Sequence, residues 1–97
     1  MTLIEEIDII KKKIDLRIWV LEELTIFESK FGMTTKEFRE KWGSNEIPEP
    51  EDHKLLEEFL EWEGLSESLQ NVEKELNEIE KRIKEDNILP VNLAEKF

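Results

Sequence analysis

Cysteine is absent from this sequence of 97 residues, and glycine and proline occur only three times each. Without cysteine the chain has no disulfide framework and no thiol chemistry, which fits a reducing cytoplasm. So few turn residues argue against a protein built from many short strands. No apolar run approaches the roughly 20 residues that a membrane-spanning helix needs, and the N-terminus shows no signal peptide. We therefore expect a cytoplasmic protein.

Basic residues are also scarce. The chain has 14 Lys and Arg against 25 Asp and Glu, a formal net charge of −11. Nucleic-acid binding depends on cations that contact phosphates, so this charge argues against nucleic acid as a partner. It favours a basic protein partner. The single histidine, His53, cannot form a histidine cluster for a transition metal, and the sequence has no glycine-rich phosphate loop. We expect neither a metal nor a cofactor.

One acidic motif is compatible with catalysis. Residues 57–61 read Glu-Glu-Phe-Leu-Glu, which resembles the first metal motif of all-helical nucleotide pyrophosphatases. Those enzymes need a second motif, Glu-x-x-Asp, about a dozen or more residues later, and none follows here. In a chain with 25 acidic residues a chance match to the first motif is expected. We therefore predict that the protein is not an enzyme.

The apolar residues that are present recur with the spacing of long helices. Between residues 55 and 83 they alternate at intervals of three and four, and this a/d pattern predicts a helix with a coiled-coil seam. A similar pattern in residues 3–31 predicts a second long helix, with Arg17 at its one charged seam position. Residues 14–20 also alternate as a strand would, and strand is the minor alternative there. The two seams contain Leu3, Ile7, Ile10, Ile14, Leu21, Leu24 and Phe31, and Leu55, Trp62, Leu65, Leu69, Val72, Leu76, Ile79 and Ile83.

The segment between these helices predicts a turn and a short third helix. Gly32 is placed as a helix C-cap, and Thr34-Thr35-Lys36-Glu37 matches a capping box that would begin a helix over about residues 35–42. The simplest architecture is an all-α, antiparallel hairpin of two long helices with the short helix at its tip. Residues 1–86 would form this single domain, and residues 87–97 a loosely attached C-terminal tail.

A two-helix hairpin leaves apolar surface uncovered. Ile9, Leu16, Val20 and Phe27 form a second ridge on the first helix, about 100° from its seam. Soluble monomers rarely expose a patch of that length, so we expect either a partner chain or a homodimer that forms a four-helix bundle. Near the tip, the register would place two carboxylates together, and Phe27 and Phe59 are expected to turn inward there instead.

Acidic and aromatic residues are interleaved at the start of the second long helix. Glu57, Glu58 and Glu61 surround Trp62, while Phe38 and Trp42 lie in the short helix. Aromatic anchors among carboxylates suit a surface that docks onto a basic protein. The alternative is that the aromatic residues close the hairpin tip and the acids form a solvated face.

One stretch resembles a known group of proteins. Residues 27–38 read Phe-Glu-Ser-Lys-Phe-Gly-Met-Thr-Thr-Lys-Glu-Phe, Trp42 follows, and Glu61-Trp62 comes after a variable loop. This run is similar to small archaeal and cyanobacterial antitoxins, which are encoded beside a small toxin gene. The resemblance covers roughly residues 24–65, and the two prolines in the loop here depart from the pattern.

The resemblance implies a stoichiometric, non-catalytic protein that neutralises a cognate toxin, often a ribonuclease. It does not identify that toxin. A ribonuclease presents a basic cleft, and an acidic surface with aromatic anchors can occupy one. The competing hypothesis is a structural coiled-coil homodimer, or a scaffold protein without a toxin partner.

Overall fold

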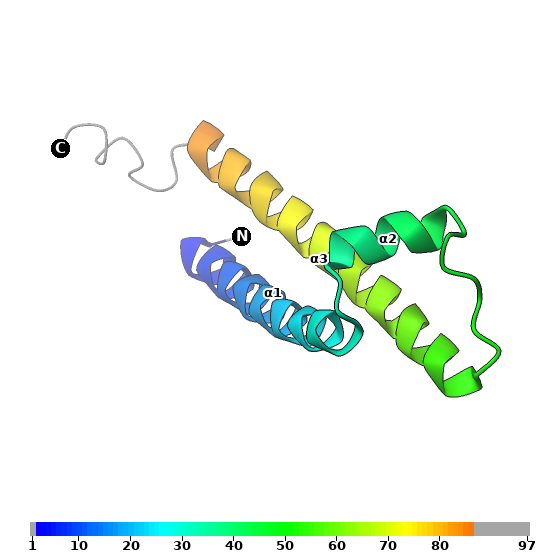
Figure 1. Cartoon of the computed structure of the whole chain (residues 1–97). Helices are drawn as coiled ribbons and strands as arrows, with labels where there is room; N and C mark the ends of the chain where they lie inside the picture. The colour runs from blue at the N-terminus through cyan, green and yellow to red at the C-terminus, as the bar shows by residue number, and fades with distance from the viewer. Residues whose placement is uncertain (1, 87–97) are drawn as a thin grey trace.

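The computed structural model describes residues 2–86, and this part of the chain folds into three helices without a strand (Figure 1). They are α1 (Leu3–Phe31), α2 (Thr35–Gly43) and α3 (His53–Asp86). The all-α prediction is confirmed. The strand alternative for residues 14–20 is wrong, because these residues lie inside α1. The predicted C-terminal tail lies outside the described residues.

The helix ends are fixed by local hydrogen bonds. At the start of α1, the Thr2 hydroxyl accepts the backbone N–H of Glu5 at 3.2 Å, and the Glu5 carboxylate accepts the N–H of Thr2 at 3.1 Å. Gly32 ends α1 in the left-handed conformation with φ of 67°, which glycine adopts without strain. Thr34 then caps α2 by accepting the N–H of Glu37 at 3.1 Å, as the capping-box sequence indicated.

The two long helices run side by side in opposite directions (Figure 1). Three ion pairs join the two helices in one antiparallel register. From one pair to the next, the residue number in α3 falls by as much as the residue number in α1 rises. These pairs are Glu6 with Arg82 at 2.7 Å, Lys13 with Glu75, and Lys30 with Glu58 at 2.7 Å. Such steady pairing over most of α1 means that the helices stay in contact along their length.

The core lies where all three helices meet. Trp62 of α3, Phe38 of α2 and Val20 of α1 are completely buried. The Phe38 and Trp62 rings stack with centroids 4.0 Å apart, and Phe27 stacks on the same indole at 5.6 Å. Phe59 is buried beside Phe38, so the expectation that Phe27 and Phe59 turn inward is correct. The best-packed part of the molecule is therefore its α2 end.

The seam of α1 differs from the predicted one. Leu24 is buried and Phe31 half-buried as expected, but Leu3, Ile7, Ile14 and Leu21 are exposed. Glu6 and Val20, each one residue before an exposed seam residue, are buried instead, and Phe27 is buried as well. Because α1 carries apolar residues on several sides, spacing alone did not fix its rotation. The aromatic contacts of Phe27 and the ion pairs of Glu6 and Lys13 accompany the rotation that is found.

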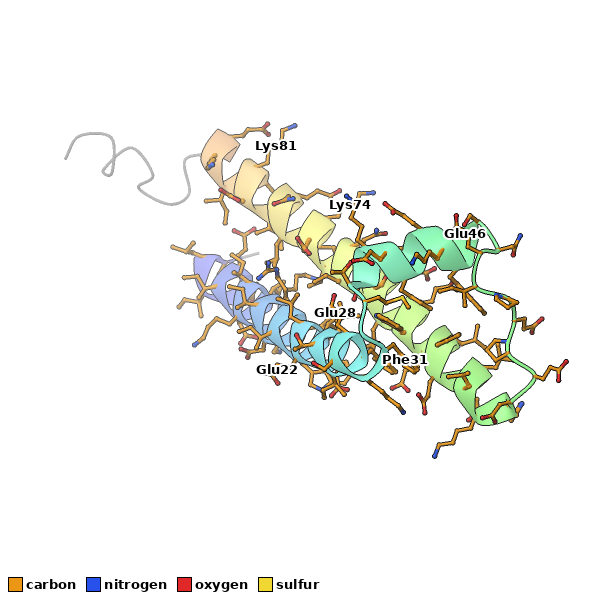
Figure 2. All side chains as sticks on the ribbon, viewed as in Figure 1. Glu22, Glu28, Phe31, Glu46, Lys74 and Lys81 are labelled. Atoms are coloured by element: carbon orange, nitrogen blue, oxygen red, sulfur yellow. The ribbon has the colours of Figure 1, made fainter. Side chains whose placement is uncertain are left out.

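Two hydrogen bonds in series connect the three helices next to this aromatic core. Glu28 of α1 accepts the backbone N–H of Thr35 at 2.6 Å, and the Thr35 hydroxyl accepts the indole N–H of Trp62 at 3.0 Å. Figure 2 shows Glu28 in the space between α1 and α2. A buried indole N–H without a partner is costly, so these two hydrogen bonds fix where α2 sits on α3.

We expect Thr35→Val to lower the free energy of unfolding by about 1–2 kcal/mol, because it leaves the buried Trp62 N–H unpaired while keeping the side-chain volume. Urea denaturation followed by circular dichroism measures this loss. Thr34→Val is not a suitable control, since Thr34 caps α2, whereas Thr25→Val changes an exposed threonine in α1. Equal losses for Thr35→Val and Thr25→Val would contradict the role of this hydrogen bond.

Candidate functional site

The aromatic residues predicted to anchor a partner face the inside of the molecule. Phe38 and Trp62 are completely buried, so neither ring is available to another chain in this structure. Trp42 is half-buried and packs on Phe38 and Phe59, with ring centroids 6.0 and 5.5 Å apart. The partner-anchor interpretation of Phe38 and Trp62 is therefore wrong. The alternative, in which the aromatic residues close this end of the hairpin, describes their positions.

The three predicted acidic contacts have different surroundings. Glu57 is exposed and lies 3.1 Å from His53 one turn earlier, and Glu61 is exposed. The Glu58 carboxylate is mostly buried and bonds to Lys30 of α1, so it serves to join the helices. Only Glu57 and Glu61 of this set remain open to a basic partner.

The second ridge of α1 is divided by the rotation of that helix. Val20 and Phe27 belong to the core, which corrects the prediction that they lack a partner within the chain. Ile9 is half-buried, and Leu16 is exposed. This ridge is therefore not a continuous exposed surface, and it gives no reason to expect a dimer.

A different apolar surface is exposed to solvent. Among the described residues ten large apolar side chains are exposed, and nine of them belong to α1. Five of these nine follow the alternating spacing of three and four residues that brings side chains onto one face of a helix. We call this set the outer face, and it consists of Ile4, Ile7, Ile14, Ile18 and Leu21.

The outer face could have been found in the sequence. Its spacing is as regular as that of the predicted seam, and it shares Ile7, Ile14 and Leu21 with that seam. What sequence reasoning missed is that Ile4 and Ile18 continue the pattern on the solvent side. Lys11 occupies the one polar position between Ile7 and Ile14. The signal was the presence of two overlapping apolar stripes on one helix.

A row of acidic side chains borders the outer face. Asp8, Asp15 and Glu22 are exposed and follow one another at intervals of seven residues, so they lie along one line of α1. Figure 2 shows Glu22 on the side of α1 that faces away from α2 and α3. Beyond this row, Trp19 and Ile26 expose more than half of their surface. The solvent side of α1 thus combines aliphatic, acidic and aromatic residues.

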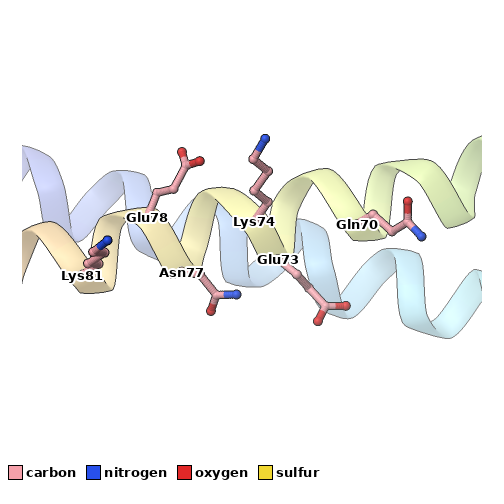
Figure 3. Close-up of a pocket in the computed structure, with 6 residues that line it drawn as sticks. All are labelled: Gln70, Glu73, Lys74, Asn77, Glu78 and Lys81. Carbon is pink, nitrogen blue, oxygen red and sulfur yellow. The ribbon is translucent and has the colours of Figure 1, made fainter.

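A shallow hollow on α3 does not have the character of a ligand site. Its lining residues all come from one helix (Figure 3), and they are Gln70, Glu73, Lys74, Asn77, Glu78 and Lys81. In the close-up Glu78 and Lys74 point one way while Asn77 and Glu73 point another, so these polar groups do not converge on one position. A ligand would meet the side of a single helix without an enclosing wall.

No group of three or more His, Asp or Glu side chains within the described residues is placed to hold a metal ion. In the same part of the chain, no helix is both long and apolar enough to cross a membrane. The candidate site is the outer face with its acidic border, because its residue types suit contact with a protein surface.

Comparison of this chain with models of protein families, with curated proteins and with solved structures gives no match.

Proposed function

We propose that this protein is a non-catalytic binding module of the antitoxin type, which binds a small basic partner protein through the solvent side of α1. The observation that carries the proposal is that, within residues 2–86, nine of the ten exposed large apolar side chains lie on α1. A surface of this kind on a charged protein is characteristic of protein–protein interfaces. The resemblance of residues 24–65 to antitoxins supplies the class of partner.

Charge supports a different chain, rather than a second copy, as the partner. The row of Asp8, Asp15 and Glu22 runs alongside the outer face. Asp8 pairs with Lys12 one turn later at 3.0 Å, so Asp15 and Glu22 are the carboxylates that lysine or arginine residues of a basic protein would bind. Two copies packed through this face would bring the same acidic rows together, and each copy carries a net charge of −11. Exposed Glu57 and Glu61 would add to the attraction that steers a basic partner towards the molecule.

The binding geometry follows from the spacing of the outer face. A partner helix could lie along α1 and pack its own apolar residues against Ile7, Ile18 and Leu21, as helices do in a coiled coil. Trp19, beyond the acidic row, offers the large aromatic surface that often dominates binding energy. α3 and α2 hold α1 rigid from behind, so the face is formed before the partner arrives.

We expect Ile18→Glu to weaken partner binding by about 30-fold or more, corresponding to about 2 kcal/mol, because it places a carboxylate in the apolar contact. The test co-expresses this chain with the product of the neighbouring gene and measures the affinity of the two proteins by calorimetry. Leu60→Glu is the matched control. Ile18 and Leu60 are 48% and 50% exposed, and the charge change is identical, but Leu60 lies on α3.

Equal affinities of the Ile18→Glu and Leu60→Glu variants would show that the partner does not bind the outer face. Sedimentation of the isolated chain gives the second test. If the chain alone is a stable dimer that Ile18→Glu separates, the outer face joins two copies, and a structural homodimer replaces the antitoxin proposal.

A further inference from the structure

An apolar groove lies between the two long helices at the end away from α2. It encloses about 450 Å³ and is lined by Ile10 and Ile14 of α1 and by Leu76, Ile79 and Ile83 of α3, with Glu80 and Lys84 at its edge. A neighbouring hollow of about 430 Å³ shares Ile14 and Leu76 and extends to Arg17 and Asn77. Because they share these two residues, the groove and the hollow are continuous along the pair of helices, and we call both together the groove.

At this groove, no element of the described part of the chain covers the two long helices. At the other end, α2 packs Phe38 against Phe59 and Trp62 and so covers the pair. No described element does the same over Ile10, Ile14 and Leu76, which remain half-buried or exposed. Covering these side chains would remove apolar surface from water at about 25 cal/mol per Å².

The segment that follows α3 has the composition and the position to fill it. α3 ends at Asp86, less than one turn after Ile83 and Lys84, which line the groove. Residues 87–97 contain six apolar residues, one acid and one base, so their side chains add no net charge. The apolar ones are Ile88, Leu89, Val91, Leu93, Ala94 and Phe97.

The segment is also long enough. Asn77, at the far hollow, lies nine residues before Asp86, which is about 14 Å along the helix axis. An extended chain covers about 3.3 Å per residue, so eleven residues could span about 36 Å. The segment could therefore turn back and pass along the whole groove.

We propose that residues 87–97 fold back over this groove and cover Ile10, Ile14, Leu76 and Ile79 in the same molecule. A second copy is the less favourable occupant, because it brings another net charge of −11 and must bind from dilute solution. A tethered segment acts at an effective concentration in the millimolar range. The cover takes up Ile14 of the outer face and leaves Ile4, Ile7, Ile18 and Leu21 exposed, so this proposal can be tested apart from the proposed function.

The test uses Nile red, a neutral dye that fluoresces on apolar surface, with the full chain and with a chain that ends at Asp86. If the segment covers the groove, its removal raises the fluorescence at least about twofold because the groove opens. If the segment does not cover it, removal leaves the fluorescence unchanged or lowers it, since six apolar residues are lost. A rise in fluorescence therefore supports the proposal, and an unchanged or lower fluorescence contradicts it.

Point variants of the full chain guard against an effect of truncation on folding. Leu93→Asp should raise the dye signal as truncation does, whereas Asn92→Asp adds the same charge at a neighbouring polar position and should not. Equal signals for these two variants would overturn the proposal. So would a full-length dimer that Leu93→Asp converts to monomer, because the segment would then bind a second copy. Partner binding is measured separately on Ile18→Glu, so either proposal can fail alone.

Discussion

Replacing Trp62 with alanine is expected to lower the free energy of unfolding by about 3–5 kcal/mol, as for other large buried aromatic residues. The indole is completely buried and stacks on Phe27, Phe31 and Phe38. Its removal would leave a cavity where the three helices meet, and Thr35 would lose its hydrogen-bond partner. A loss of this size is a large part of the stability of a small domain. Urea denaturation followed by circular dichroism at 222 nm measures it.

Trp19→Ala provides the matched control, because the same side chain is removed from a position that is 51% exposed. We expect it to change the free energy of unfolding by less than about 1 kcal/mol. If Trp19 belongs to the binding surface, the same variant weakens the interaction with the partner while the protein stays folded. A smaller loss for Trp62→Ala than for Trp19→Ala would mean that the core has been assigned to the wrong tryptophan.

Much of the fold could be predicted from the sequence because the signals are local. The capping residues Thr34 and Glu37 and the helix stop at Gly32 act within a few residues of their own position. On α3 most apolar residues form one stripe, and Trp62, Leu65, Val72 and Ile83 of this stripe are buried. A helix with a single apolar stripe has only one way to face its neighbour.

The rotation of α1 could not be predicted in the same way. Its apolar residues form overlapping stripes, so periodicity permits several rotations of nearly equal apolar content. The choice depends on contacts with other helices, such as Phe27 stacking on Trp62 and Lys13 pairing with Glu75. These contacts join residues far apart in the sequence, and a local pattern does not contain them.

The errors in the candidate site have the same origin. Aromatic residues among acids suit both an interface and a small core, and composition does not separate the two. In the structure α2 folds across α3, so Phe38 covers Trp62, while Glu57 and Glu61 stay exposed. The sequence contains both apolar stripes of α1, but the rotation of the helix decides which of them is exposed, and only the structure gives that rotation.

Reversing the charge of Arg82 should test the rotation of α1 directly. Glu6 is only 6% exposed, and Arg82 donates to its carboxylate at 2.7 Å. Arg82→Glu would place a second carboxylate beside a buried one, and we expect the free energy of unfolding to fall by about 2–3 kcal/mol. This is less than the 3–5 kcal/mol typical for breaking a fully buried pair, because the Arg82 side chain is half exposed. Thermal and urea denaturation give the value.

Lys84→Glu is the control, since it makes a similar charge change two residues later in the last turns of α3. Its pair with Glu80 is exposed on both sides, so it should cost no more than about 1 kcal/mol. The double variant Glu6→Arg with Arg82→Glu restores the pair in reverse and should recover at least half of the loss. The predicted seam puts Ile7 inward and leaves Glu6 beside it in solvent. If Arg82→Glu costs no more than Lys84→Glu and the reversed pair recovers nothing, Glu6 does not face α3, and the outer face would have to be assigned anew.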